Sequence, residues 1–146
     1  MATGTWQIYG TAALKIANGT LNLGAGTYNI ALAATAYTPN VDTDDFFDDI
    51  GTPRSGTNWA AAGVAVTLSF SQITASNRVA VIPTDVSVAT VTLTDGKHAI
   101  LYKVLGGASS ADPLIAYLTW DTALAPTAGT LAIDNDNTNG AFYFAY

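Results

Sequence analysis

The sequence predicts an all-β fold: a single-domain antiparallel β-sandwich over residues 1–146, jelly-roll-like, with one short acidic helix or turn. Three observations support this prediction. Apolar residues alternate with small or polar ones along many short segments, which is the pattern of half-buried strands. Turn residues separate these segments at roughly ten-residue intervals, as in sandwiches and barrels. All eleven acidic residues are aspartates, which favour turns and caps over helix interiors.

The chain is poor in charge, and its net charge is negative. Charged residues make up 11% of the 146 residues, against about 25% in ordinary soluble domains. The formal net charge is −6 at pH 7, and phosphate binding needs clustered lysine or arginine, so we expect no nucleic-acid partner. No run of about 18 apolar residues occurs, so we expect no membrane partner. The absence of cysteine excludes disulfides and thiolate metal ligands.

The first half of the chain contains one ambiguous element and two clearer strands. Residues 7–17 fit either a strand or a short helix, and Asn18-Gly19 ends that element in both cases. Strands are predicted at 28–34 and 64–70, where the alternation is regular. The side chains on the predicted inward faces of these two strands are Tyr28, Ile30, Leu32 and Ala34, and Val64, Val66, Leu68 and Phe70.

The second half is expected to be almost entirely β-structure. Its predicted strands lie at 79–82, 86–93, 97–105, 114–120, from 131 onward, and at 141–146. Asp95-Gly96 is the strongest hairpin signal in the sequence, and it predicts that the second and third of these strands are antiparallel neighbours. The inward side chains of the fourth strand are predicted to be Leu114, Ala116, Leu118 and Trp120. The whole chain then has eight or nine strands.

Residues 36–51, with the sequence AYTPNVDTDDFFDDIG, interrupt the alternation and hold five of the eleven acidic residues. Thr43 is a good N-cap, and Asp44 and Asp45 would follow it in a first helical turn, where negative charge is favourable. Gly51 would end the element. The apolar side chains at helical spacing are those of Phe46, Phe47 and Ile50.

This acidic stretch has two interpretations. In the first, one or both phenylalanines anchor it to the rim of the β-core, and Trp59 lies together with Phe46 and Phe47. In the second, it is a solvated loop whose aspartates only keep the surface hydrated. We favour the first, because the apolar residues follow the spacing of one helix face.

The sequence shows no pattern typical of a catalytic or metal centre. The aspartates at 42–49 offer paired carboxylates, but a glycosidase site also needs an aromatic groove and an acid of raised pKa. DNDNTNG at 134–140 resembles the start of a calcium loop, yet its glycine comes one position late and no glutamate closes it. His98, the single histidine, is expected to be a half-exposed strand residue. We expect no enzyme activity and no cofactor; calcium at Asp134 and Asp136, or at 42–45, is the alternative.

Aromatic side chains are the remaining functional candidates, as residues that bind a protein partner. Interfaces are enriched in aromatic residues and depleted in charge at their centres. The candidates for binding a protein partner are Trp6, Phe46, Phe47, Trp59, Phe142, Phe144 and Tyr146. A sugar-binding platform formed by Trp6, Trp59, Trp120 and the terminal FYFAY at 142–146 is a second interpretation of the aromatic residues, and an ordinary role in the core is a third.

Several short motifs follow one another in a fixed order. They are YGTAALKIANG at 9–19, AYTPNVDTDDFFDDIG at 36–51, WAAAGVAVTL at 59–68, ILYK at 100–103, SADPLIAYLTWD at 110–121, and an aromatic C-terminal strand. The order resembles that of a family of small structural proteins of tailed bacteriophages, in which an sYTPn.dt.dfF.di block, a glycine-rich GG..L segment and a PLigY.df strand recur. The chain departs from that pattern at 53–59 (PRSGTNW), where a glutamate and a Gly-Tyr-Thr-x-Gly-Gly portion are usual.

The resemblance implies a non-enzymatic protein of the virion. Members of such families are commonly capsid cement or decoration proteins with jelly-roll-like sandwiches, and others are tail components. For this chain it implies synthesis in the host cytoplasm and a place on the outer surface of the capsid. Its partners would be the major capsid protein and other copies of itself around a capsid symmetry axis. The alternative is a tail-associated or receptor- or carbohydrate-binding module.

Overall fold

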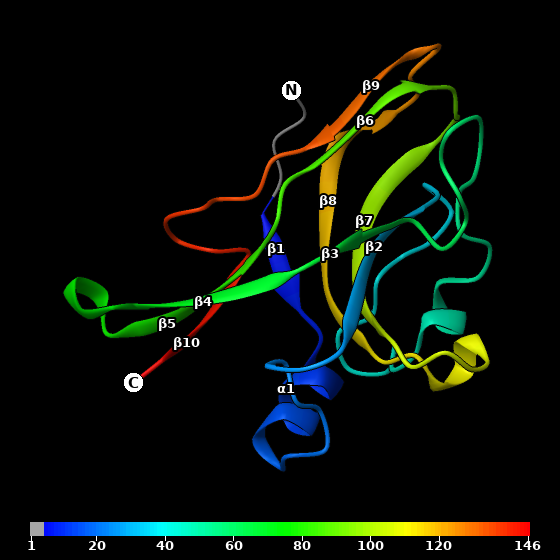
Figure 1. Cartoon of the computed structure of the whole chain (residues 1–146). Helices are drawn as coiled ribbons and strands as arrows, with labels where there is room; N and C mark the ends of the chain where they lie inside the picture. The colour runs from blue at the N-terminus through cyan, green and yellow to red at the C-terminus, as the bar shows by residue number, and fades with distance from the viewer. Residues whose placement is uncertain (1–4) are drawn as a thin grey trace.

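Ten strands form three antiparallel sheets in residues 5–146, the part of the chain that this computed structural model describes (Figure 1). The largest sheet contains, in spatial order, β1 (Trp6–Ile8), β8 (Leu114–Leu124), β7 (Gly96–Val104), β2 (Thr27–Ala33) and β3 (Val64–Val66). The second sheet contains β10 (Phe142–Ala145), β5 (Arg78–Pro83) and β4 (Leu68–Ile73), and the third contains β6 (Val86–Val91) and β9 (Gly129–Ile133). The helical elements are α1 (Gly10–Ala17) and three short 3-10 turns, η1 (Phe47–Ile50), η2 (Thr74–Ser76) and η3 (Ser109–Ala111).

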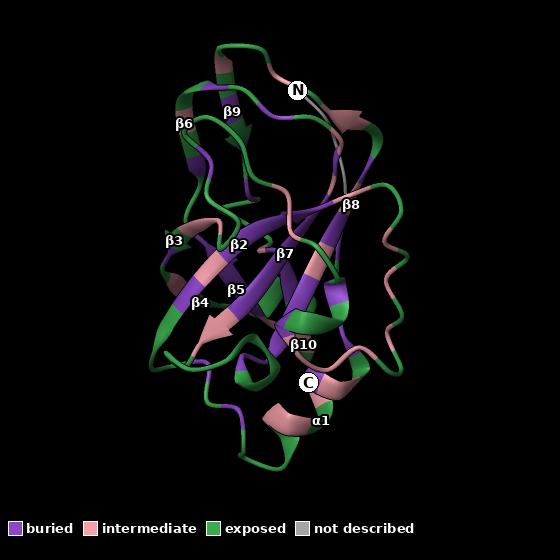
Figure 2. Ribbon diagram, turned by 90° about the vertical axis from the view of Figure 1, so that its right-hand side faces the viewer, coloured by how far each residue is buried: buried purple, intermediate pink, exposed green. Residues whose placement is uncertain are grey.

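The three sheets share one hydrophobic core, and the predicted antiparallel β-sandwich is confirmed. Strands β7 and β8 lie at the centre of the large sheet, and Figure 2 shows them largely buried. Most of the predicted inward side chains of β2 and β8 are buried, namely Tyr28, Ile30, Leu32, Leu114, Ala116, Leu118 and Trp120. The intervening Ala31, Ala33 and Ile115 are buried as well. The large sheet is therefore covered on both faces.

The acidic strap, as we call residues 36–51, covers one face of the large sheet. His98 and Tyr102 point to this face, because alternate residues of β7 share a face. The ring of Phe47 stacks on that of Tyr102, with centroids 4.0 Å apart and planes at 12°. The ring of Tyr37 meets His98 edge-on at a centroid distance of 5.6 Å. The anchoring of the acidic stretch to the β-core is thus confirmed, over the sheet face rather than at its rim.

The helical turn inside the acidic strap starts later than predicted. Thr43 is not its N-cap: η1 begins at Phe47, directly after the extended Phe46. The carboxylate of Asp49 accepts hydrogen bonds from the backbone N–H groups of Asp45 and Phe46, at 2.7 and 3.0 Å. Asp49 therefore makes the reciprocal half of a capping box, in which a residue of the first turn bonds back to the N-cap backbone.

The predicted hairpin at Asp95-Gly96 is wrong. Strand β6 pairs with β9, whereas β7 pairs with β2 and β8, so the strands on either side of Asp95-Gly96 belong to different sheets. Asp95 does adopt the left-handed conformation that the signal implies, with φ 60°. Its carboxylate, however, accepts hydrogen bonds from the backbone and hydroxyl of Thr35. The turn connects two layers of the sandwich instead of two neighbouring strands.

The strand predicted at 64–70 is two strands in two different sheets. Strand β3 ends at Val66 and β4 begins at Leu68, with Thr67 between them. Val66 is buried, as predicted, but Phe70 is 46% exposed. The alternation thus continues into a segment that leaves the body of the molecule, and Phe70 does not point into the core.

The segment at 7–17, predicted to be either a strand or a short helix, contains one of each. Residues 6–8 form the edge strand β1, and α1 follows after Tyr9. Tyr9 is fully buried, and its backbone N–H donates to the carbonyl of Ile115 at 3.0 Å, which keeps the start of α1 against β8. This element and the division of the strand at 64–70 raise the number of strands above the predicted eight or nine.

Candidate interaction surface

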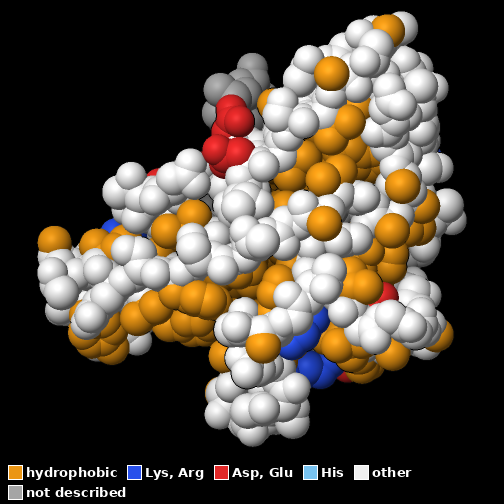
Figure 3. All heavy atoms as spheres, in the orientation of Figure 1, with side chains coloured by type: hydrophobic (Ala, Val, Ile, Leu, Met, Phe, Trp, Pro, Cys, Tyr) orange, Lys and Arg blue, Asp and Glu red, His pale blue; other side chains and the backbone are white. Residues whose placement is uncertain are grey.

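The second sheet leaves the body of the molecule and forms an arm that ends at η2 (Figure 1). We call residues 68–83 and 141–146 the projecting arm. Three of its aromatic side chains, Phe70, Tyr143 and Tyr146, are 46%, 54% and 62% exposed. Figure 3 shows hydrophobic side chains gathered along the lower edge of this arm. Arg78 is its single charged residue, so the arm has the aromatic, charge-poor composition of an interface centre.

The C-terminal strand ties the arm together. Asn77 ends η2 in the left-handed conformation, with φ 49°, which asparagine tolerates well, and β5 then returns along β4. On the other side of β5, β10 pairs in antiparallel register, with Phe142 opposite Val81. At the tip, the backbone N–H of Tyr146 donates to the carbonyl of Asn77 at 2.9 Å, and the Gln72 amide donates to the Tyr146 hydroxyl at 2.7 Å.

The polar turn at 134–140 precedes β10 and positions it beside the edge of β5. The carboxylate of Asp136 accepts hydrogen bonds from the backbone N–H groups of Asn139 and Thr138, at 2.7 and 2.9 Å. These hydrogen bonds lower the pKa of Asp136. Gly140 then has φ +80°, and a Cβ at this position would lie 2.7 Å from the Val81 carbonyl oxygen, so only glycine fits. Asp136 of the DNDNTNG motif therefore acts as a turn-former.

A groove of 730 Å³ separates the projecting arm from the large sheet. The edge strands β1 and β10 flank it, and within residues 5–146 each pairs with a single strand, β1 with β8 and β10 with β5. We call this space the edge groove. Its lining includes Trp6 and Ile8 from β1, Phe142 and Tyr143 from β10, and Arg78 from β5.

Arg78 lies across the arm beside the edge groove. Its Cζ atom is 4.7 Å from the centroid of the Tyr143 ring, and its Nε donates to the hydroxyl of Ser76. The register places Arg78 opposite Ala145 and Ala80 opposite Tyr143, so Arg78 and Tyr143 are diagonal neighbours on one face. An exposed stacking contact of this kind orients the guanidinium without neutralising it.

A second groove, of 470 Å³, lies against the other face of the projecting arm. Phe70 and Phe144 share that face, because the register places Phe70 opposite Val81 and Val81 opposite Phe142. The groove is completed by apolar residues of α1 and of the chain that follows it, Ile16, Leu21 and Leu23. Both faces of the arm thus present apolar, concave surface.

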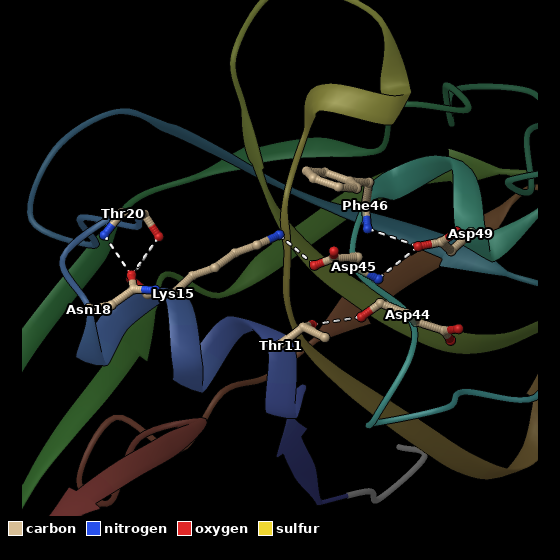
Figure 4. Close-up of polar contacts among 8 residues, drawn as sticks. All are labelled: Thr11, Lys15, Asn18, Thr20, Asp44, Asp45, Phe46 and Asp49. Atoms are coloured by element: carbon tan, nitrogen blue, oxygen red, sulfur yellow. Dashed lines mark hydrogen bonds and ion pairs between the residues drawn. The ribbon is translucent and has the colours of Figure 1, made fainter.

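Polar contacts hold the acidic strap to α1 (Figure 4). The hydroxyl of Thr11 donates to the backbone carbonyl of Asp44 at 2.8 Å. Lys15 forms an ion pair with Asp45, the one ion pair within residues 5–146, and its Nζ lies 4.0 Å from the centroid of the Phe46 ring. Three of the five strap aspartates, Asp44, Asp45 and Asp49, therefore hold the strap in place through hydrogen bonds or an ion pair.

His98 is buried, at 5% exposure, and not half-exposed as predicted. It lies in the centre of the large sheet under the acidic strap, and its Nδ1 is 2.8 Å from the Thr119 hydroxyl. Burial lowers the pKa of His98. Beside it, the Tyr37 hydroxyl donates to Asp44 Oδ2 at 2.7 Å and lies 2.8 Å from the Tyr9 hydroxyl. Burial raises the pKa of both tyrosines, which keeps their hydroxyls protonated.

Among residues 5–146, no group of three or more histidine or aspartate side chains is placed to hold a metal ion. Asp134 is exposed, and Asp136 is engaged in its own turn. In the same described region, none of the helices has the length and apolarity needed to cross a membrane.

The structure divides the seven predicted partner-binding aromatics by burial. Four belong to the core, Trp6, Phe47, Trp59 and Phe142. Phe46 and Phe144 are half-buried, and Tyr146 is exposed. Trp6 and Phe142 both line the edge groove, and Phe144 lines the second groove. Within residues 5–146 no ring contact joins Trp59 to Phe46 or Phe47; Phe47 stacks on Tyr102 instead.

Comparison of the chain with protein-family profiles, with curated proteins and with solved structures found no match in any of the three.

Three residues of this surface are absent from the partner-binding candidates predicted from the sequence: Phe70, Arg78 and Tyr143. The regular alternation at 64–70 predicts that Phe70 lies in the core, and Tyr143 lies one position out of phase with Phe142 and Phe144. A single arginine at the start of a strand carries no signal by itself. Its relevance depends on the pairing of β5 with β10, which brings Tyr143 beneath it.

Proposed function

We propose that this protein is a non-enzymatic structural protein of a phage virion, a cement or decoration protein that binds the major capsid protein lattice and stabilises the head. The observation that carries the proposal is the projecting arm, with three largely exposed aromatic side chains and one charge. Such a surface is suited to burial against another protein. The ordered motifs that resemble small phage structural proteins support the same assignment.

The shape of the molecule supports the proposed mode of action. A cement protein must contact more than one neighbour, and here the body and the projecting arm offer separate surfaces. One contact through the arm would be modest, but many copies on a closed shell reinforce each other, because release of one contact leaves others engaged. We assign the arm to the major capsid protein and to neighbouring copies around a symmetry axis.

Copy number tests this proposal directly. Cement proteins are present in numbers comparable to the major capsid protein, whereas tail parts are present in far fewer copies. Purified virions would be separated by gel electrophoresis, and the band of this protein compared with that of the major capsid protein. A ratio near that of the capsid lattice supports the cement proposal, and a ratio typical of tail parts overturns it.

Removal of the protein from the virion provides a second test of the proposal. Heads assembled without it should lose a density on the outer surface and should break at a lower temperature than complete heads. Re-addition of the purified protein should restore both properties. If heads without it keep every outer density and survive heating equally well, the protein is not a cement, and the tail-associated or receptor- or carbohydrate-binding alternative takes its place.

A further inference from the structure

The edge groove has the backbone geometry of a peptide-binding site. Strands β1 and β10 flank it, and within residues 5–146 neither pairs with another strand on the groove side. Native proteins usually protect such edges with charged residues or proline. Residues 142–145, with the sequence FYFA, contain neither. An extended segment that adds to the β10 edge would satisfy its free backbone groups, as in other cases of strand addition.

Arg78 determines which side chains such a segment should carry. Arg78 belongs to β5, but its guanidinium lies over Tyr143 and thus reaches across the neighbouring strand toward the open edge. A strand added to β10 would lie about 4.8 Å beyond it. A carboxylate on that strand could therefore meet the guanidinium, which offers its N–H groups in a fork that matches carboxylate geometry.

The charge distribution favours an acidic occupant. The chain has a net charge of −6, yet among residues 5–146 the lining of the edge groove contains Arg78 as a cation and no carboxylate side chain. Asp136 is near enough for Arg78 to help lower its pKa, but no ion pair joins the two. The rest of the lining is mainly apolar, with Trp6, Ile8 and Phe142. The groove is therefore complementary to an extended segment that alternates apolar residues with a carboxylate.

We infer that the edge groove binds an extended acidic segment of a partner protein, which adds to the β10 edge and places a carboxylate on Arg78. The inference deepens the proposed function and rests on it for the identity of the partner, which on a phage head would be the major capsid protein. Its chemistry, main-chain pairing plus one charge-assisted hydrogen-bonded pair, does not depend on that identity.

The test begins with selection from a library of short random peptides displayed against the purified protein. We expect enrichment of peptides with a carboxylate flanked by β-branched or aromatic residues. A selected peptide is then titrated while the intrinsic tryptophan fluorescence of the protein, to which Trp6 in the groove contributes, is recorded. The same peptide with asparagine or glutamine in place of its acid is titrated alongside. The acidic peptide should bind about tenfold more tightly, which corresponds to about 1.4 kcal/mol. Binding should also slow amide hydrogen exchange at Tyr143 and Ala145.

Two variants give the test its specificity. Arg78→Gln should bind both peptides equally and with the affinity of the neutral one. Arg54→Gln is the matched control, because Arg54 is also free of a carboxylate partner within residues 5–146 but donates to Thr94, outside the groove. It should keep the tenfold preference. Unfolding midpoints of both variants show whether each is folded.

Three results would overturn the inference: no enrichment of acidic peptides, an unchanged preference in Arg78→Gln, or protection from exchange that excludes β10. Saturation of the groove by a second copy of this chain, seen as dimers in sedimentation, would replace the proposed occupant. The outcome is independent of virion copy number. If acidic peptides bind through Arg78 but the copy number is typical of tail parts, the groove inference stands and the cement function is rejected. If no acidic peptide binds but the copy number matches the capsid lattice, the cement function stands and the groove inference is rejected.

Discussion

Two adjacent phenylalanines in the acidic strap have different environments. Phe47 is buried and stacked on Tyr102, whereas Phe46 is half-buried, with its ring beside the ammonium group of Lys15. In an extended or turned backbone, neighbouring side chains diverge, so one of the pair must face outward. The sequence pattern shows that at least one aromatic serves as an anchor, but not which one.

The two phenylalanines should therefore differ in their contribution to stability. Phe47→Ala should lower the free energy of unfolding by about 3–5 kcal/mol, as expected for a buried aromatic residue. Phe46→Ala should lower it by about 1 kcal/mol, because its contacts are part-exposed and include one cation–π contact. Urea unfolding of both variants measures the difference. Losses below about 0.5 kcal/mol for each would show that the strap is a solvated loop after all.

His98 should make stability depend on pH. The unfolded histidine has a pKa near 6.5, and burial holds the pKa of His98 lower in the folded protein. As the pH falls, the unfolded state therefore binds the proton first, and the folded state loses stability below about pH 6.5 by at most about 1.4 kcal/mol per pH unit. Above about pH 6.5, where His98 is neutral in both states, its protonation no longer reduces the stability of the folded protein.

Urea unfolding between about pH 7.5 and 5.5 tests this, since aspartates titrate mainly at lower pH. His98→Gln is the control, because glutamine keeps a polar group near Thr119 but does not titrate. Its stability should change less than that of the parent protein over this range. If the free energy of unfolding changes equally with pH in the two proteins, groups other than His98 cause the pH dependence.

At the scale of elements, local patterns predicted which segments are strands, but not how they pair. The strands at 28–34 and 114–120 were recognisable because one face of each alternates regularly and is buried. The turn at Asp95-Gly96 has the expected left-handed residue, but the same backbone conformation also suits a connection between sheets. Pairing depends on contacts between residues distant in sequence, such as that of β6 with β9.

The candidate site was even less accessible to sequence reasoning. The edge groove combines β1, β5 and β10, which come from the beginning, the middle and the end of the sequence. Trp6 and Phe142 could be proposed because aromatic residues are common at interfaces. Arg78 could not, since its position across Tyr143 follows from the register of β5 and β10.

Gly140 should be essential for the attachment of β10 to the projecting arm. Gly140→Ala introduces a left-handed alanine and also places a Cβ 2.7 Å from the Val81 carbonyl oxygen. Gly106→Ala is the matched control, because Gly106 has nearly the same φ, +79°, but nothing lies within 4 Å of a Cβ there. The control should lose about 1–2 kcal/mol from backbone strain alone. Gly140→Ala should lose more, and amide exchange in β10 should accelerate.

Urea unfolding and hydrogen exchange measure these two effects on the same samples. Equal losses of stability in the two variants would show that β5 moves away from a Cβ at 140 without penalty, and that the start of β10 is not fixed by close packing.

At the scale of the whole molecule, stability and binding should reside on different parts. The buried core lies in the large sheet and the layers packed on its two faces, whereas the exposed aromatics lie on the projecting arm (Figures 2 and 3). Val81 and Phe142 of the arm belong to the core, but the exposed Phe70, Tyr143 and Tyr146 do not. The separation allows the arm surface to be changed without unfolding the body.

The double variant Phe70→Ser/Tyr146→Ser tests this separation, because both side chains are largely exposed on the arm. Its free energy of unfolding should stay within about 1 kcal/mol of the parent value, as for surface substitutions. Its binding to heads that lack the protein should fall at least tenfold in a sedimentation assay, because exposed aromatics at an interface commonly dominate its affinity. Leu105→Ser is the control: Leu105 is 59% exposed but lies after β7, away from the arm. If the control loses as much binding as the double variant, or if the double variant binds like the parent, the body and not the projecting arm contacts the lattice.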